Sequence, residues 1–354
     1  MKPDFFKNLP PEIITEIFLR LPVVSVPISK CVCKRWLHLL ESDDFVKSHF
    51  ARSAPALVVL GDSGRLKVLE WEGELDPLTQ YDFPYRPREI NTSVNGLLFL
   101  RLYLLLCVCN PITCEVIKLN LPSDPQKSFS KVSAFGFGAS KITGRYKAVC
   151  FKYNDYDDKL DCHVYTLGTG SWRRLEGINP YVYQYDKGAF VNGNLHWTAS
   201  IGEDSSWISC FDVETECFSF FKAPPYHAQG LPFTRGRSLC ALSGCLWFCE
   251  EAFEYENDGG RCELTIWIMK EYGVGESWSL AYVIPLVDND TFLVDPIKVS
   301  DNGDLLILLE ELISWLYVLK TGVSIPLQRW FPIYETAVRA SLNCLIKSLR
   351  NLPS

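Results

Sequence analysis

An apolar residue recurs at every fourth position near the start of the chain: Leu9, Ile13, Ile17 and Leu21. On a helix these positions share one face, so the spacing predicts an amphipathic helix. Pro10 and Pro11 stand where this helix would begin, because a first-turn residue has no helical N–H bond to lose, and Pro22 would end it. A second helix is predicted from another apolar set: Val32, Trp36, Leu39 and Leu40.

From about residue 55 the pattern becomes one of short strands and turns. A tight turn opens an apolar strand in five segments: "NGLLFL" from 95, "GRYKAVCF" from 144, "NGNLHW" from 192, "SGCLWF" from 243 and "NGDLLIL" from 302. The copies lie roughly 50 residues apart, and "GRLKVLEW" from 64 is a possible earlier copy. A repeat of this length with about four strands is typical of a propeller blade. We therefore predict an all-β propeller with five or six visible blades; the alternative is a β-sandwich or two stacked sheets.

The chain thus divides into parts of unequal kind, which makes it an α+β multidomain protein. We assign residues 1–50 to a small all-α module, residues 55–345 to the propeller and residues 346–354 to a tail. Some 40 to 50 residues bury too little surface to fold well alone. The helices are therefore either a cap on the following domain or a docking module that a partner's helices complete.

The N-terminal segment "LPPEIITEIFLRLP…CVCKRW" resembles an F-box. The matching positions are Leu9, Pro10, Glu12, Ile17, Phe18, Leu21, Val32, Lys34 and Trp36. Pro27 and Ser29 depart from the Leu- and Arg-rich helix that relatives carry at this point. Proline removes a backbone donor and can break or shift a helix start, so the middle helix of the module is expected to be affected.

The strand segments resemble the F-box-associated domain of the large plant F-box families, which is related to kelch propellers. The resemblance rests on "SVNGLLFL", "NPITCEVIKLNLP", "VYTLGTGSWRRL", "AFVNGNLHW" and "CFDVETECFSFF", in that order. It implies the substrate-recognition subunit of an SCF-type ubiquitin ligase, which binds an adaptor and through it a cullin, presents an unknown protein substrate and does no catalysis itself. The residues that would contact the adaptor are Leu9, Pro10, Ile13, Ile17, Leu21, Val32 and Trp36.

Charge and cysteine usage narrow the class of protein. A net charge of −7 argues against a nucleic-acid partner, which would favour a basic face. The first residues lack a signal-peptide pattern, so the 14 cysteines are expected to be reduced and mostly buried. The longest apolar runs are too short or too interrupted by glutamate to cross a membrane. We therefore expect a cytoplasmic or nuclear protein with no membrane partner.

Motifs for catalysis are largely missing from the sequence. We find no P-loop, Gly-x-Ser-x-Gly or zinc-ligand spacing, and we predict no cofactor and no metal. His196 lies in a predicted strand beside Trp197 and is interpreted as a structural histidine. The acidic stretch 154–161 lacks the glycine and the final glutamate of an EF-hand loop, and is interpreted as a solvated loop.

Aromatic residues serve two predicted purposes. Those that recur in step with the repeat are assigned to the core: Trp172, Trp197, Phe218, Trp247, Trp267 and Trp278. Two predicted loops, 179–188 and 224–237, are rich in Tyr, Pro and Arg, which are typical of interfaces. Their candidate substrate contacts are Tyr181, Tyr183, Tyr185, Tyr226, Arg235 and Arg237.

Two other functions remain open at this point. The first is a propeller enzyme or small-ligand binder with a helical cap, which would need polar residues converging on the central channel. The second is an F-box protein that binds its partner without causing its degradation. Neither domain type by itself decides between them.

Overall fold

The structure is a computed structural model of the 354-residue chain. It describes residues 9–21, 25–52, 55–60, 65–71, 75–82, 87, 89–102, 105–111, 113, 115–120, 132–153, 160–176, 187–201, 204–225, 233–254, 262–286, 293–299, 305–310, 314–319, 328–333 and 336–341.

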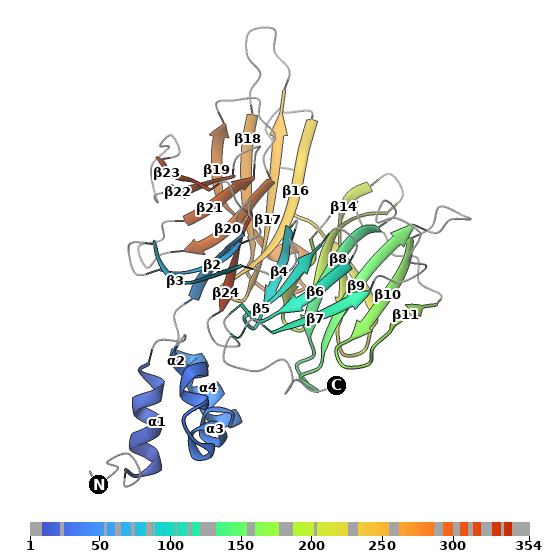
Figure 1. The fold of residues 1–354 in the computed structure, drawn as a ribbon. Helices are drawn as coiled ribbons and strands as arrows, with labels where there is room; N and C mark the ends of the chain where they lie inside the picture. Colours follow the sequence, from blue (N-terminus) through green and yellow to red (C-terminus); the bar gives the residue numbers. More distant parts are fainter. Residues whose placement is uncertain are drawn as a thin grey trace, which may run out of the picture. The chain divides into compact units, whose positions relative to one another are not determined.

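In the described residues, four α-helices precede the first strand (Figure 1): α1 Pro11–Leu19, α2 Ser25–Lys30, α3 Lys34–Leu40 and α4 Asp43–Arg52. The first and third confirm the helices predicted from the apolar spacing, although α3 begins two residues after Val32. Helix α4 was not predicted. Its N-terminal turn carries Asp43 and Asp44, and its last turn carries His49 and Arg52, an arrangement that suits the helix dipole.

Pro27 does not prevent the middle helix. Helix α2 starts at Ser25, so Pro27 is its third residue. The first turn of a helix has N–H groups without intrahelical partners, and a proline there loses no hydrogen bond. The Ser29 hydroxyl donates to the Ser25 carbonyl oxygen at 2.8 Å, which is a local bond along the same helix. Pro27 therefore does not break this helix, and the expectation of a break is wrong.

The described strands form six four-stranded sheets, each made mainly of strands consecutive in sequence. Each sheet contains antiparallel pairs of consecutive strands. The six described sheets agree with the predicted blade repeat and are at odds with a sandwich of two sheets. The segment "GRLKVLEW" contains strand β2 Arg65–Trp71, so it is a further copy of the repeat.

Contact density divides the chain into two compact units. Residues 1–119 with 337–352 form one unit, and residues 120–336 with 353–354 form the other. The domain boundaries predicted near residues 50–55 and 345 stay predictions.

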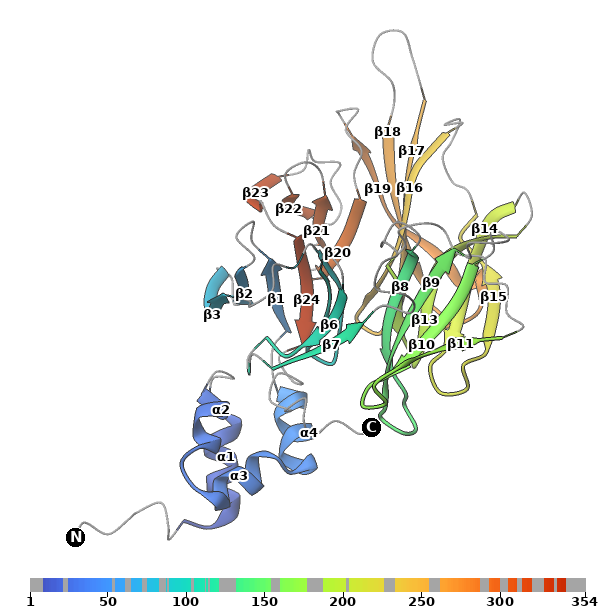
Figure 2. The same ribbon diagram turned by 45° about the vertical axis from the view of Figure 1, so that its right-hand side comes forward.

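The first unit contains the helices and two sheets. Its strands are β1 Pro55–Leu60, β2 Arg65–Trp71, β3 Leu75–Asp82, β4 Glu89–Val94, β5 Leu97–Arg101, β6 Leu105–Cys109, β7 Val116–Asn120 and β24 Thr336–Ser341. Strand β24 lies beside β1 in the order β24-β1-β2-β3 (Figure 2), so one sheet joins strands from both ends of the strand region. Residues 342–354, which include the predicted tail, lie outside the described part of the chain.

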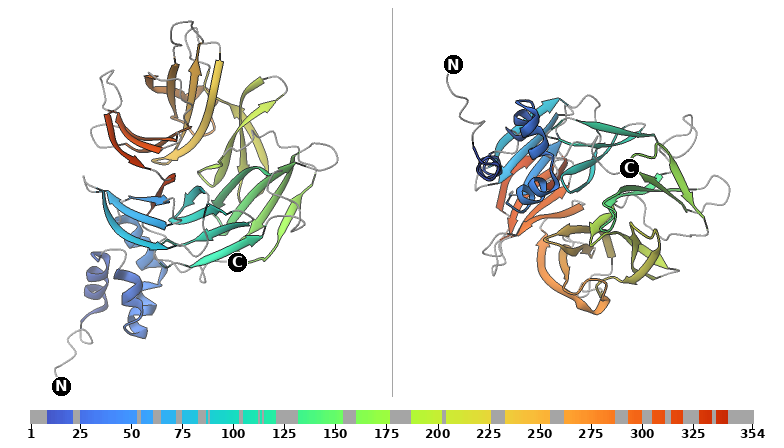
Figure 3. Two further views of the ribbon diagram at one scale, coloured as in Figure 1. Left: turned by 45° about the horizontal axis from the view of Figure 1, so that its top comes forward. Right: turned by 90° about the horizontal axis from the view of Figure 1, so that it is seen from below.

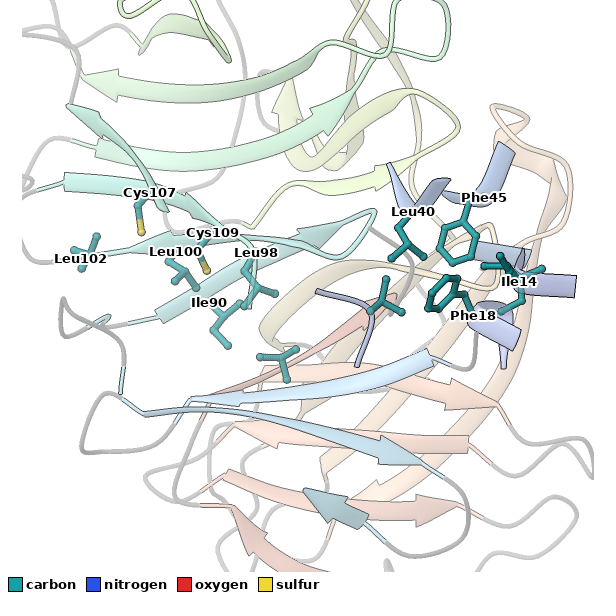
Figure 4. Close-up of a cluster of buried hydrophobic side chains, with 13 residues drawn as sticks. Ile14, Phe18, Leu40, Phe45, Ile90, Leu98, Leu100, Leu102, Cys107 and Cys109 are labelled. Carbon is teal, nitrogen blue, oxygen red and sulfur yellow. The ribbon is translucent and has the colours of Figure 1, made fainter. Parts of the chain in front are cut away.

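Buried side chains of this unit form two groups in one cluster (Figure 4). The helices contribute Ile14, Phe18, Leu40 and Phe45, and the strands contribute Ile90, Leu98, Leu100, Cys107 and Cys109. Cys107 and Cys109 alternate along β6 and are both fully buried. Their burial agrees with the expectation that most cysteines of the chain lie in the core.

The second unit contains four sheets. Their strands are β8 Val132–Ala139, β9 Tyr146–Tyr153, β10 Leu160–Thr166, β11 Trp172–Leu175, β12 Ala189–Val191, β13 Asn194–Ile201, β14 Asp204–Asp212, β15 Phe218–Lys222, β16 Phe233–Leu242, β17 Cys245–Phe253, β18 Cys262–Met269, β19 Trp278–Leu286, β20 Leu293–Val299, β21 Leu305–Glu310, β22 Ser314–Leu319 and β23 Gln328–Ile333. Figure 3 shows the strands of the β16–β19 sheet, in yellow to orange, side by side.

Asn-Gly and Ser-Gly turns connect the first two strands of several sheets. Both turn residues have positive φ at Asn95–Gly96 (49° and 78°), Asn192–Gly193 (54° and 81°) and Ser243–Gly244 (53° and 77°). Two consecutive left-handed residues define a type I′ turn, whose twist matches that of the flanking strands. The turns therefore fix the hairpin register that the sequence pattern predicted.

Tryptophan side chains link neighbouring sheets of the second unit. The Trp197 indole is fully buried and donates to the Phe135 carbonyl oxygen at 2.9 Å, which crosses from the β12–β15 sheet to the β8–β11 sheet. The Trp278 indole donates to the Lys222 carbonyl oxygen at 3.1 Å. This hydrogen bond joins the β16–β19 sheet to the β12–β15 sheet. Four of the six aromatic residues assigned to the core are buried, while Trp172 and Phe218 are half-buried.

We predict that alanine substitutions at Gly136 and Gly244 will lower the free energy of unfolding by different amounts. A Cβ at Gly136 would lie 2.5 Å from the Trp197 ring, which its hydrogen bond holds in place, so Gly136→Ala should destabilise the protein by about 2–3 kcal/mol. A Cβ at Gly244 would meet no atom within 4 Å, so Gly244→Ala should cost only the left-handed backbone strain of about 1 kcal/mol. Urea unfolding measures both; an equal cost would contradict the tight Gly136–Trp197 contact.

Candidate functional site

The four helices bury apolar side chains against one another. Helix α2 packs on α3, and α4 packs on α1. The rings of Phe18 and Trp36 meet edge to face with centroids 4.9 Å apart, which connects α1 to α3. Phe18, Val26 and Leu40 are at most 3% exposed, so one residue from each of the first three helices lies in the core of this helical module.

Polar contacts also connect distant parts of the helical module, which we define as residues 9–52. The Arg35 guanidinium donates to the Leu9 carbonyl oxygen at 3.3 Å, and so joins the start of α3 to the segment before α1. The Arg52 guanidinium donates to both carboxylate oxygens of Glu16, at 3.0 and 3.1 Å. These hydrogen bonds lower the pKa of Glu16, but the pair is at the surface and contributes little to stability.

An apolar set on the helical module remains exposed to solvent. Its members are Ile13 at 48%, Ile17 at 40%, Ile28 at 71% and Val32 at 61% of their full exposure. Ile13 and Ile17 are four residues apart on α1 and share one face, while the adjacent Ile14 and Phe18 are buried. A module that leaves several β-branched apolar side chains exposed has the character of a binding surface. We call these four residues the exposed apolar set.

The residues expected to contact an adaptor divide into two groups. Pro10, Ile13, Ile17 and Val32 are exposed, whereas Leu9, Leu21 and Trp36 are half-buried and pack against the core. The second group therefore also has a structural role. Ile28 was not among the predicted contacts, because the sequence departs from the F-box pattern at Pro27 and Ser29.

The predicted substrate contacts are placed only in part. Tyr181, Tyr183, Tyr185 and Tyr226 lie outside the described residues. Arg235 and Arg237 were expected in a loop, and that placement is wrong, because strand β16 already begins at Phe233. The Arg237 guanidinium lies 2.7 Å from the Glu250 carboxylate, which is 5% exposed, so this arginine is engaged in an ion pair with β17.

His196 is a fully buried residue with hydrogen bonds at both ring nitrogens. Its Nδ1 lies 3.0 Å from the Ala189 carbonyl oxygen and must donate to it, so Nε2 accepts from the Tyr272 hydroxyl at 2.9 Å. Burial lowers its pKa to about 4, although the Ala189 hydrogen bond opposes the shift. Both nitrogens are occupied and the ring stays neutral, which agrees with the structural interpretation of this histidine.

The acidic stretch is described only at its end. Residues 154–159 lie outside the described part, and the Asp161 carboxylate is 2.7 Å from the Arg174 guanidinium. Among the residues that the structure describes, no three His, Cys, Asp or Glu side chains gather in a way that could hold a metal ion. In the same residues, no helix has the length and apolar character needed to cross a membrane.

Comparisons with known proteins agree with this two-part organisation. Residues 6–48 match the family described as "F-box domain", and residues 72–323 match the family described as "F-box associated beta propeller domain". The fold is therefore an N-terminal helical F-box followed by a β-propeller, as the sequence predicted.

Individual relatives extend the same match along the chain. "F-box protein CPR1" of Arabidopsis thaliana is 27% identical over 78% of this chain and 73% of its own length. "F-box protein At3g07870" of the same plant is 31% identical over 78% of this chain and 73% of its own length. Among solved structures, a protein of unknown function from Bacteroides caccae covers 81% of this chain and 99% of its own, with 9% identity and a TM-score of 0.39.

We predict that neighbouring positions on α1 will respond differently to truncation. Phe18→Ala removes a ring that is 3% exposed and contacts Trp36, so it should destabilise the helical module by about 3–5 kcal/mol. Ile17→Ala removes a side chain that is already 40% exposed and should cost no more than about 0.5 kcal/mol. Hydrogen–deuterium exchange of the amides of α1 to α4 measures both; similar protection losses would contradict the division into core and surface.

We predict that His196 makes the propeller sensitive to acid. The pKa of histidine is about 6.5 in an unfolded chain and about 4 here, so the unfolded state binds the proton first as pH falls. Above pH 6.5 the histidine is neutral in both states and its effect is absent. Between pH 6.5 and pH 5 it should lower the free energy of unfolding by roughly 2 kcal/mol. His196→Asn should reduce this pH dependence in urea unfolding; an unchanged dependence would contradict the buried neutral ring.

Proposed function

Because this chain belongs to the family of F-box proteins with an F-box associated β-propeller domain, we propose that it is the substrate-recognition subunit of an SCF-type cullin-RING ubiquitin ligase. F-box domains generally bind the adaptor subunit of such ligases. In this proposal the helical module docks on the adaptor, and through it on a cullin, while the propeller holds a protein substrate.

The observation that carries this proposal is the exposed apolar set. Ile17 and Val32 are among the positions that match the F-box pattern, and Ile13 follows the matching Glu12. Each of the three apolar side chains is at least 40% exposed. The neighbouring side chains Ile14, Phe18 and Val26 are already buried, so the module does not need the exposed ones to form its core. Helices of a partner can cover them and gain the free energy of removing apolar area from water.

The proposed activity requires no covalent step by this chain. Holding a substrate lysine near the charged conjugating enzyme makes ubiquitin transfer effectively intramolecular. The propeller contributes a rigid frame for this purpose, because type I′ turns connect strands within its sheets and tryptophan hydrogen bonds connect neighbouring sheets. Binding loops carried by such a frame are held in position relative to one another.

We predict that a charge in the exposed apolar set prevents adaptor binding without unfolding the protein. Ile17→Asp and Val32→Asp should each weaken adaptor affinity by at least about thirtyfold, the effect of losing an interface anchor worth roughly 2 kcal/mol. Ile142→Asp is the matched control, because Ile142 is 82% exposed on the turn between β8 and β9, far from these positions in the sequence. Calorimetric titration of the full-length protein with purified adaptor measures the affinities.

Three outcomes of this titration are informative. Loss of binding in the two helical variants, with Ile142→Asp unaffected and all unfolding transitions unchanged, supports the proposal. Adaptor binding that survives both helical variants, or no binding by the unmodified protein, contradicts it. Adaptor binding without ubiquitin transfer to any captured protein in a reconstituted ligase would favour the non-degradative F-box protein instead.

A further inference from the structure

Two thiols adjoin an exposed member of the apolar set. Cys31 and Cys33 lie on either side of Val32, in the link between α2 and α3, and both are exposed. The Cys31 thiol makes only a long contact of 3.8 Å to the Pro27 carbonyl oxygen, and Cys33 makes no capping hydrogen bond to α3. Both sulfur atoms are therefore accessible to a reagent in solution.

Most other thiols in the described residues are buried or half-buried. Cys107, Cys150 and Cys162 are fully buried, and burial raises the pKa of Cys107 to about 12 and raises the pKa of the other two as well. A buried thiol of this kind neither ionises readily nor meets a dissolved oxidant. Among the cysteines that the structure describes, Cys217 is the other exposed one, at the turn between β14 and β15.

Two cationic residues follow the thiol pair in the sequence. Lys34 and Arg35 come directly after Cys33, and both are exposed. Cationic side chains at a surface attract anionic reagents. A disulfide that carries carboxylates, such as glutathione disulfide, fits both the charge and the accessibility of this site.

We propose that Cys31 and Cys33 form a modification site for thiol–disulfide exchange with glutathione disulfide, and that the adduct blocks adaptor docking. This inference rests on the proposed function. The thiolate of either cysteine attacks one sulfur of glutathione disulfide, and a new S–S bond forms as the old one breaks. Glutathione leaves as a thiolate and takes up the proton that the cysteine lost, so one thiol and one disulfide are consumed and one of each is produced.

The adduct acts through bulk and charge. A glutathionyl group places a charged tripeptide next to Val32, which is 61% exposed and belongs to the set that the adaptor would cover. Burying that charge in an apolar interface is costly, so docking and modification exclude each other. The bond is reversible by thiols, and reduction restores the docking surface.

The test uses the full-length protein, glutathione disulfide and purified adaptor. Peptide mass spectrometry locates the adducts, and titration with adaptor gives the affinity before treatment, after treatment and after reduction with dithiothreitol. The double variant Cys31→Ser with Cys33→Ser removes the site, and serine is favoured at the N-cap position of Cys33, so α3 is retained. Cys217→Ser is the matched control, because it removes the exposed thiol of the propeller.

We expect the adduct on Cys31 or Cys33 to weaken adaptor affinity by at least tenfold in the native protein and in Cys217→Ser, with recovery on reduction. The double variant should keep its affinity after treatment. Adducts on Cys31 or Cys33 that leave the affinity unchanged, or adducts confined to other cysteines, would overturn this inference alone. If the reduced, untreated protein does not bind adaptor, the proposed function fails and this inference fails with it.

Discussion

Close approach between successive sheets is the constraint on which the second unit depends. A four-stranded sheet with two apolar faces cannot cover itself, so each must pack on its neighbours. Trp197 shows what this requires: the indole is fully buried, its N–H bonds to Phe135, and it occupies space that a Cβ at Gly136 or Gly188 would take. Because the sheets meet at a few crowded points of this kind, the frame is rigid and the connecting loops are free to vary.

The helical module, in contrast, leaves part of its apolar surface uncovered. It is too short to bury all of its apolar side chains, so the helices cover Phe18, Val26 and Leu40 and leave Ile28 and Val32 in water. The unburied part is a standing free-energy cost in the isolated chain, and a partner that covers it recovers that cost.

Sequence reasoning predicted the features that rest on local chemistry. The Asn-Gly and Ser-Gly pairs identified the hairpins, because left-handed turn residues leave few alternatives. It was less accurate where packing decides. Helix α2 tolerates Pro27 because the helix begins two residues earlier, and β16 extends back to Phe233, which removes Arg237 from the predicted loop. The exposure of Ile28 depends on how three helices pack, and no periodicity along one of them reveals it.

Several buried or half-buried ionisable groups in the described part of the propeller have internal partners. The neutral His196 is bonded at both nitrogens, Glu250 is paired with Arg237, and Glu216 lies 2.9 Å from the Lys147 ammonium. Removing one partner of such a contact would leave the other buried and unpaired, which destabilises a folded protein. Accessible apolar side chains and thiols occur in both parts of the chain, but in the helical module three of them, Cys31, Val32 and Cys33, are consecutive. A partner that docks there would therefore meet an apolar side chain and two thiols together.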